Sequence, residues 1–389
     1  MSRVDVYDVV IIGGGCAGLS LARELCRIPT SPKTLVLESR GNYVNDKTWC
    51  FWASNNHHLY HLVSKEWAKW EISTVSGDAI THSASGRSYQ MIRSIDFYND
   101  ALDIIDREPN VNVKTQAPVF GIRRDADGLE ISLPDGVVYA RRVVDTRPPM
   151  KKKLQSATLL QCFMGHEVET EQPVFDPHKA GLMTDMRDDG LGFRFVYVLP
   201  LSSQRALVET TRFCTTLCPK AQLAKDLEED TRNLLGGQDG RVIYAECGAL
   251  PMGMPATEGG DKEVYRAGIS GGALRAATGY GFQNIQQWAE RFANALSGYG
   301  SETHASASKF QSFMDEIFLR TLKRHPDRCA EFFHSIAATL EGGEFSDFMS
   351  GYSRLGVWRR IVQSLPPRPF LYTLLHRQDN IASQRVVVR

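Results

Sequence analysis

Glu209 is an acid that directly follows the apolar residues ALV in the segment ALVETTRF. In an extended strand, alternation places Leu207, Glu209 and Thr211 on one face, with Val208 and Thr210 on the other. Because burial disfavours the carboxylate anion, a glutamic acid on an apolar face keeps its proton nearer neutral pH, as a general acid must. A single strand glutamate is more often solvated, so the residue types alone leave both interpretations open.

The segment NDKTWCFW gathers aromatic side chains just behind an acid. Asp46 comes first, and Trp49, Phe51 and Trp52 follow it closely. Such a run is typical of a buried strand, but it also suits the wall of a pocket for a large apolar ligand. Aromatic faces would add roughly 2 kcal/mol each to the binding of a desolvated cation. In such a pocket we expect Asp46 to orient a group within or beside the wall.

A glycine-rich turn near the start predicts a nucleotide site. VYDVVIIGGGCAGLSLARELCR indicates a buried strand, a turn that fits G-x-G-x-x-G, and a helix. Gly13 permits the tight turn, Gly15 lets the backbone approach a pyrophosphate, and Gly18 lets the helix pack close to the strand. The start of the helix, which includes Ala17, offers free N–H groups to the phosphates.

Glu38 ends a second predicted strand, TLVLESR, twenty residues beyond Gly18. An acid at that place accepts hydrogen bonds from a ribose diol and repels a 2′-phosphate. This first segment therefore fits NAD or FAD equally well.

Two later segments favour FAD. YARRVVDTRPP predicts a strand ending at Asp145, similar to the strand that closes the nucleotide domain in FAD-binding folds of the aromatic-hydroxylase type. VYRAGISGGALRAATGYGFQNIQQWAERFANAL predicts a strand, a glycine turn and a long helix. The second helix N-terminus would face the flavin or its phosphates. The cofactor contacts expected in these two segments are Asp145, Thr278, Gly279, Tyr280, Gly281 and Phe282.

Two strand pairs are expected between these segments. LEISLPDGVVYA predicts a hairpin that turns at Asp135 and Gly136. FRFVYVLPLSSQRALVETTRF predicts two further strands around a corner at Pro200. We expect both pairs to lie outside the parallel nucleotide sheet.

The predicted fold class is therefore α/β with an α+β insert. It combines a GxGxxG FAD-binding, Rossmann-like domain of the aromatic-hydroxylase type with a mixed-sheet substrate domain and a helical C-terminal region. The expected parts are residues 1–150 and 245–300 for the FAD domain, 151–244 for the substrate domain and 301–389 for the helical region.

Composition excludes several classes of function. The 45 basic residues balance the 45 acidic ones, so the surplus of positive charge that nucleic acid requires is absent. The 8 cysteines form no CxxC pair, which favours reduced thiols and a cytoplasmic location. His57 and His61 would need a helix and a third ligand to bind a metal, so we expect none.

Membrane contact is expected to be peripheral at most, because the sequence has no apolar run long enough to span a bilayer. Residues 351–377, GYSRLGVWRRIVQSLPPRPFLYTLLHR, contain five arginines and no acid. Such a stretch can lie in an anionic membrane interface. It could equally form helices packed on the body with arginines reaching into solvent.

Several of these motifs, in this order, resemble the flavin-dependent lycopene cyclase family. The similar stretches are DVVIIGGGCAGLSLA, DKTWCFW, MTDMR, FRFVYVLPLSSQRALVETTRF, GALPMG, GGALRAATGYGF and the tail FMSGYS to IVQSLPPRPFL. The resemblance covers most of the chain. It implies a membrane-associated isomerase that uses reduced FAD, with NAD(P)H as the reductant, to close a ring at the end of a linear, lycopene-like polyene without net oxidation.

The resemblance also assigns roles to residues. Glu209 matches the family's catalytic glutamate, and Tyr197, in the same strand pair, is expected in the substrate pocket with the aromatic residues of NDKTWCFW. The family usually has a second carboxylate directly after the glutamate, whereas this chain has Thr210. Asp185 or Asp46 could take that place, and the substrate could be a related terpenoid polyene.

Two other functions stay open at this stage. A flavoprotein monooxygenase would share the fold and would consume NAD(P)H and oxygen. A protein that escorts a lipid would use the fold without chemistry, although an intact glycine turn and an acid in an apolar strand argue against lost catalysis.

Overall fold

The structure is a computed structural model that describes residues 6–125, 128–257, 262–296, 298 and 301–377. Two seven-stranded sheets and a three-stranded sheet form its framework. The small sheet contains β3 (Thr48–Ala53), β4 (Val63–Trp67) and β7 (Ser88–Arg93), with β7 between the other two.

The first sheet contains the glycine turn. Its strands are β1 (Val6–Ile12), β2 (Thr34–Leu37), β8 (Val111–Lys114), β9 (Gly121–Asp125), β10 (Gly128–Leu133), β11 (Gly136–Asp145) and β17 (Val264–Arg266). Their order is β8-β2-β1-β11-β10-β9, and β17 also pairs with β11. The central strand β1 ends in four buried apolar residues and runs parallel to both neighbours. This pattern is expected of a strand covered on both faces.

The predicted hairpin at Asp135 and Gly136 forms, but it belongs to this first sheet. Strands β10 and β11 pair antiparallel, starting at Leu133 opposite Gly136. The same β11 then continues alongside β1 until Asp145 lies opposite Ile12. The expectation that the hairpin lies outside the nucleotide sheet is wrong, because one ten-residue strand serves both the hairpin and the parallel core.

The second sheet is mostly antiparallel. Its strands are β5 (Lys69–Thr74), β6 (Ala79–Ser83), β12 (Leu159–Thr170), β13 (Lys179–Asp188), β14 (Phe193–Pro200), β15 (Arg205–Cys214) and β16 (Gly240–Met252), in the order β16-β12-β15-β14-β13-β5-β6. The predicted pair β14 and β15 is confirmed. The predicted boundaries at residues 150 and 244 do not separate the sheets, since β5 and β6 precede the first and β16 crosses the second.

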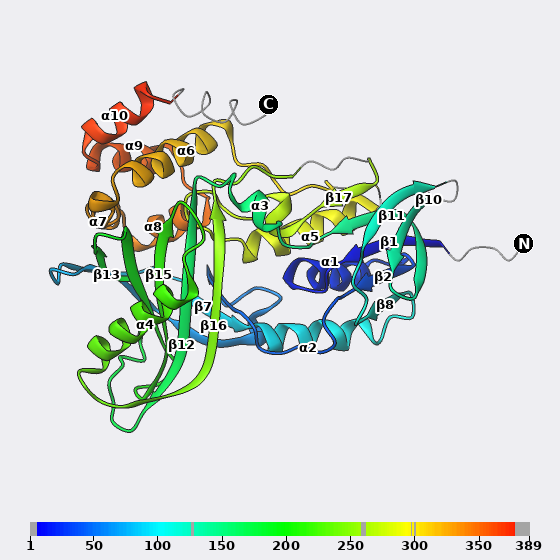
Figure 1. The fold of residues 1–389 in the computed structure, drawn as a ribbon, viewed down its shortest axis with the longest axis horizontal. Coiled ribbons are helices and arrows are strands. Elements are labelled where there is room, and N and C mark those ends of the chain that lie inside the picture. The colour runs from blue at the N-terminus through cyan, green and yellow to red at the C-terminus, as the bar shows by residue number, and fades with distance from the viewer. Residues whose placement is uncertain (1–5, 126–127, 258–261, 297, 299–300, 378–389) are drawn as a thin grey trace, which may run out of the picture.

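The helices cover the two large sheets separately (Figure 1). Helix α1 packs against α2 and α5 beside the first sheet, α4 packs on β12 and β15, and α7 contacts β13 and β5. None of the described helices has both the length and the apolar content needed to cross a bilayer. The helices are α1 (Cys16–Arg27), α2 (Ser94–Ile105), α3 (Lys151–Leu154), α4 (Lys220–Leu235), α5 (Phe282–Leu296), α6 (Lys309–Arg324), α7 (Cys329–Thr339), α8 (Gly342–Ser350), α9 (Leu355–Ser364) and α10 (Pro367–Leu375).

Candidate active site

The glycine turn has the geometry that a dinucleotide needs. Gly13 has φ of +96°, and a Cβ on Gly18 would lie 1.9 Å from the carbonyl oxygen of Gly13. A Cβ on Gly15 would meet no atom within 4 Å, so this position faces open space. No side chain caps the N-terminus of α1. The free N–H groups and the open space at Gly15 together form a cradle for a pyrophosphate.

Glu38 is fixed beside this turn as an anion. Its carboxylate accepts hydrogen bonds from the Gly14 N–H at 2.6 Å and from the Arg40 N–H at 2.8 Å. Burial opposes its ionisation, but the hydrogen bonds and the charge of Arg40 outweigh burial and lower the pKa of Glu38. Arg40 also contacts Asp46 at 3.2 Å, and the Tyr98 hydroxyl donates to Asp46 at 2.9 Å. Asp46 is therefore tied to the nucleotide end of the site.

A cavity of about 670 Å³ connects this cradle with the second sheet. Apolar and aromatic side chains form much of its wall, as is usual for a site that binds a small molecule. Most of the residues predicted for the cofactor and the substrate line this one cavity. They are Gly13, Gly15, Ala17, Glu38, Asp46, Trp49, Tyr197, Glu209, Thr278, Gly279, Tyr280, Gly281 and Phe282.

Glu209 faces the cavity from β15, where it lies opposite Tyr197 of β14. Burial and then the negative charge of Glu246 raise the pKa of the Glu209 carboxyl well above its ordinary value. The Thr211 hydroxyl donates to Glu209 at 3.2 Å, which only partly offsets this effect. Glu209 can therefore hold a proton at a pH where a solvated glutamate has lost it.

Tyrosine hydroxyls supply polar groups without charge to the same part of the cavity. The hydroxyls of Tyr89 and Tyr280 lie 3.0 Å apart. Burial raises the pKa of Tyr197 and of Tyr280, so both phenols stay neutral. These tyrosines thus give the wall near Glu209 hydrogen-bonding groups and aromatic faces without adding charge.

Only one of the three aromatic residues in NDKTWCFW lines the cavity. Trp49 does so, and it stacks on Phe282 with ring centroids 5.3 Å apart. Phe51 and Trp52 do not line the cavity. Phe51 stacks on Phe282 at 5.0 Å, and Trp52 packs on Tyr280 at 5.1 Å. Trp49 and Phe51 share one face of β3 and both stack on Phe282, whereas Trp52 points to the other face. Phe51 and Trp52 therefore form a second layer that supports two cavity-lining rings.

Asp145 also lies behind the wall. It is fully buried, accepts from Arg147 at 2.6 Å and forms an ion pair with Arg266. Its neighbour Thr146 lines the cavity instead, and its hydroxyl lies 2.9 Å from the Gly13 carbonyl, to which it donates. The predicted cofactor contact at Asp145 is corrected to a structural role, in which it orients the strand end beside the glycine turn.

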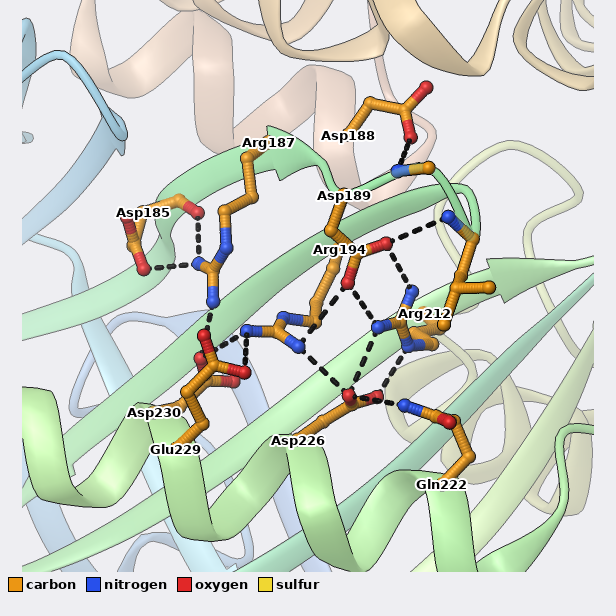
Figure 2. A network of polar contacts seen from close by, with 12 residues as sticks. Asp185, Arg187, Asp188, Asp189, Arg194, Arg212, Gln222, Asp226, Glu229 and Asp230 are labelled. Carbon is orange, nitrogen blue, oxygen red and sulfur yellow. Dashed lines mark hydrogen bonds and ion pairs between the residues drawn. The ribbon is translucent and has the colours of Figure 1, made fainter.

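Asp185 belongs to a different part of the molecule. It pairs with Arg187, which in turn contacts Asp230 of α4 at 2.5 Å. Figure 2 shows this chain of ion pairs continuing through Arg194 to Asp226, at the interface between α4 and the second sheet. Asp185 does not line the cavity. The hypothesis that it supplies the second carboxylate of the site is not supported, since its carboxylate pairs with Arg187 away from the cavity.

Glu246 is the carboxylate that the sequence analysis missed. It lines the cavity from β16 and is only 8% exposed. Gly165 of β12 lies opposite both Glu209 and Glu246, so the three residues share one face of adjacent strands. A glycine inside a long strand often marks a close approach of other groups, and Gly165 was the available signal.

His57 and His61, the two histidines considered as metal ligands, have ordinary partners. His57 lies 2.7 Å from the Gln90 side chain, and His61 lies 2.8 Å from Asp100. Among the residues that the structure describes, no three metal-binding side chains come together.

Comparison with solved structures defines the class of fold. A geranylgeranyl bacteriochlorophyll reductase-like protein from Thermoplasma acidophilum is 14% identical, with a TM-score of 0.63 over 95% of this chain and 99% of that one. A p-nitrophenol 4-monooxygenase from Pseudomonas putida is 16% identical, with a TM-score of 0.58 over 93% and 98% of the two chains. The predicted α/β fold with an aromatic-hydroxylase-type Rossmann domain is confirmed.

Sequence comparison then identifies the family within this class. The family model described as lycopene cyclase protein matches residues 8–360, and the chain belongs to that family. A lycopene beta-cyclase from Pantoea ananas is 22% identical over 95% of this chain and 97% of its own. Another, from Pseudescherichia vulneris, is 25% identical over 70% of each chain.

Proposed function

We propose that this protein is an FAD-dependent, redox-neutral cyclase that closes a ring at the end of a linear, lycopene-like carotenoid or a related polyene. The observation that carries the proposal is Glu209, a buried acid with a raised pKa in an aromatic-walled cavity that also reaches the glycine cradle. Such an acid can protonate an alkene, which water-exposed carboxylates cannot do efficiently.

The reaction needs a proton, a dry cavity and a stabilised cation. Glu209 donates its proton to the terminal alkene, and the neighbouring alkene attacks the carbocation that results. Loss of a second proton forms the ring double bond, so substrate and product have the same mass. The faces of Trp49 and of the cavity tyrosines stabilise the cation at roughly 2 kcal/mol each. When bound, reduced FAD supplies fixed negative charge near the cation, and we expect NAD(P)H to be its reductant.

The test is expression in cells that accumulate linear carotenoids. A product of unchanged mass with a shifted absorption spectrum supports the cyclase. A gain of one oxygen atom, coupled to NAD(P)H consumption, would instead establish a monooxygenase. A purified protein that binds polyene but neither holds flavin nor changes the polyene would establish an escort protein.

Gly15→Ala is expected to weaken FAD binding without unfolding the apoprotein. A methyl group at Gly15 meets no protein atom within 4 Å, and φ of −86° suits any residue. It would fill space that the cradle offers to a pyrophosphate, so affinity should fall at least about tenfold. Flavin titration of the apoprotein measures the effect, and thermal unfolding of the apoprotein checks the fold. Gly343→Ala, also in open space, is the control; equal flavin affinity in both variants would contradict the cradle.

The C-terminal helices support a peripheral membrane contact, which we also propose. Leu371 and Leu375 of α10 are 54% and 80% exposed, and Arg368 lies exposed near them. The opposite faces are packed, as Trp358 and Thr373 are buried. Both alternatives for residues 351–377 thus contribute, with one face on the body and an apolar, basic face available to anionic lipid.

Leu371→Asp combined with Leu375→Asp is expected to weaken binding to phosphatidylglycerol-containing vesicles at least about tenfold. The double variant loses the apolar area that two leucine side chains would bury in the membrane, and it gains two negative charges that anionic lipid repels. Vesicle co-sedimentation measures the effect. The matched control is Val75→Asp combined with Val137→Asp, two exposed valines outside this region. Equal losses in both double variants, or none in either, would contradict the proposed surface.

A further inference from the structure

Glu209 and Glu246 form a pair across a strand that has no side chain between them. Glu209 of β15 and Glu246 of β16 are both opposite Gly165 of β12. Two strand spacings separate their backbones by about 10 Å. The missing side chain of Gly165 lets the Glu209 stem lie over β12, where an added Cβ would come 3.1 Å from the Cβ of Glu209. Both side chains line the same cavity.

The surroundings of the two carboxyls differ. Glu246 accepts a hydrogen bond from the Tyr244 hydroxyl at 2.8 Å and is further stabilised as an anion by Thr48 and by the charge of Lys47. Burial still raises its pKa, but these groups oppose the shift. Among the described residues, Glu209 has only the Thr211 hydroxyl as its hydrogen-bond donor and feels the negative charge of Glu246, and the charge of Lys47 favours the anion of both glutamates. The pair therefore carries its proton on Glu209 and its charge on Glu246.

We propose that Glu246 is the base that accepts the second proton, after Glu209 has donated the first. This inference rests on the proposed cyclase function and deepens it. Glu209 transfers H⁺ to the alkene and becomes a carboxylate. The carbocation cyclises, a C–H bond next to the new cationic carbon breaks, and its electron pair forms the ring double bond while Glu246 takes the proton. No oxidant is consumed. After the product leaves, Glu246 releases its proton to solvent and Glu209 takes one from solvent, which restores the starting state.

Other carboxylates near the cavity are less suited to this step. Asp46 is held by Arg40 and Tyr98 at the nucleotide end, and Asp185 lies in the α4 interface. Glu38 is engaged by Arg40 and by the glycine turn. Glu246 can thus serve as the second carboxylate of the site, which the family usually has at the position where this chain has Thr210. Because the base chooses which C–H bond breaks, Glu246 also determines which ring isomer forms.

The test is turnover of lycopene in phospholipid vesicles by the reduced, flavin-loaded enzyme in D₂O. Wild type should add one deuterium per ring and give one isomer. Glu246→Gln should slow formation of that isomer at least about 100-fold. Its residual products should be deuterated but should contain other ring isomers or a water-trapped alcohol. Glu246→Asp should retain the wild-type isomer at a reduced rate. Flavin content and thermal unfolding verify that each variant is folded.

The outcomes separate this inference from the function on which it rests. Absence of cyclised product from wild type would refute the proposed function itself. If wild type cyclises and Glu246→Gln yields the same isomer at a similar rate, Glu246 is not the base. If folded Glu246→Gln and Glu246→Asp both stop deuterium uptake altogether, Glu246 acts only by positioning or tuning Glu209, which also overturns the assignment.

Discussion

Glu209→Gln is expected to abolish ring closure while the protein still folds and binds flavin. Glutamine keeps the size of the side chain and can still accept from Thr211, but it has no acidic proton to give to carbon. Loss of a general acid should lower turnover by about 100-fold to 10,000-fold. The measurement is product formation by the reduced, flavin-loaded variant, with flavin content as a check on the site.

The same substitution should make the protein more stable than wild type, and the difference should grow as the pH rises. The folded-state pKa of Glu209 lies above its unfolded value, because burial and Glu246 disfavour the anion. The wild-type carboxyl therefore favours folding fully below the ordinary glutamate pKa, and this contribution is lost as the pH passes through the raised value. Glutamine has no such loss. The melting temperature of Glu209→Gln should exceed that of wild type by a margin that grows from about pH 4.5 upward.

Glu71→Gln is the matched control, since Glu71 lies on β5 of the same sheet and does not line the cavity. It should keep turnover and should show no such stabilisation at high pH. Wild-type turnover by Glu209→Gln would remove Glu209 as the proton donor. A variant that is inactive but destabilised at every pH would mean that the side chain acts in packing.

The glycine turn and Glu209 were predictable because their signals are local. The turn needs residue types at fixed spacing, and Gly13 and Gly18 show the backbone angle and the close approach that this spacing implies. Glu209 is marked by apolar neighbours on its own strand. The short stretch of the turn carries its whole physical requirement, whereas the neighbours of Glu209 indicate only a buried acid and the family resemblance supplied its role.

Glu246 could not be found in this way because its partner lies on another strand. Only the register of β12 with β15 and β16 brings the two glutamates to one face. The hairpin strand β11 was assigned to the wrong sheet for the same reason. Its parallel pairing with β1 involves a distant part of the chain and cannot be seen in the alternation of the hairpin itself. Phe51 and Trp52 were predicted in the pocket but lie outside it. The aromatic content of a segment indicates a buried strand, but it does not say which rings reach the cavity.

Gly165→Val is expected to lower turnover at least about 100-fold, because small displacements of a catalytic group have effects of that size. A Cβ at this position would lie 3.1 Å from Cβ of Glu209 and 3.3 Å from Cδ1 of Leu207. The added methyl groups must push the glutamate stem aside or enter the space between Glu209 and Glu246. Gly165→Ala, which needs a shift of only a few tenths of an ångström, should have a smaller effect. Steady-state turnover with flavin-loaded protein gives the ranking.

A loss of folding stability alone would change the melting temperature and not the turnover of the folded protein. Overpacking typically costs about 1–3 kcal/mol of folding stability, so Gly165→Val should melt earlier yet remain folded and bind flavin normally. Its cradle is unaffected, because Gly13 and Gly15 precede α1 on the first sheet. Gly121→Val, at a strand glycine whose Cβ would meet its nearest neighbour only at 4.0 Å, should keep both turnover and flavin. Wild-type turnover by folded, flavin-loaded Gly165→Val would show that the absence of a side chain between Glu209 and Glu246 is not part of the catalytic geometry. The acid and the base would then have to act without the arrangement that β12 provides.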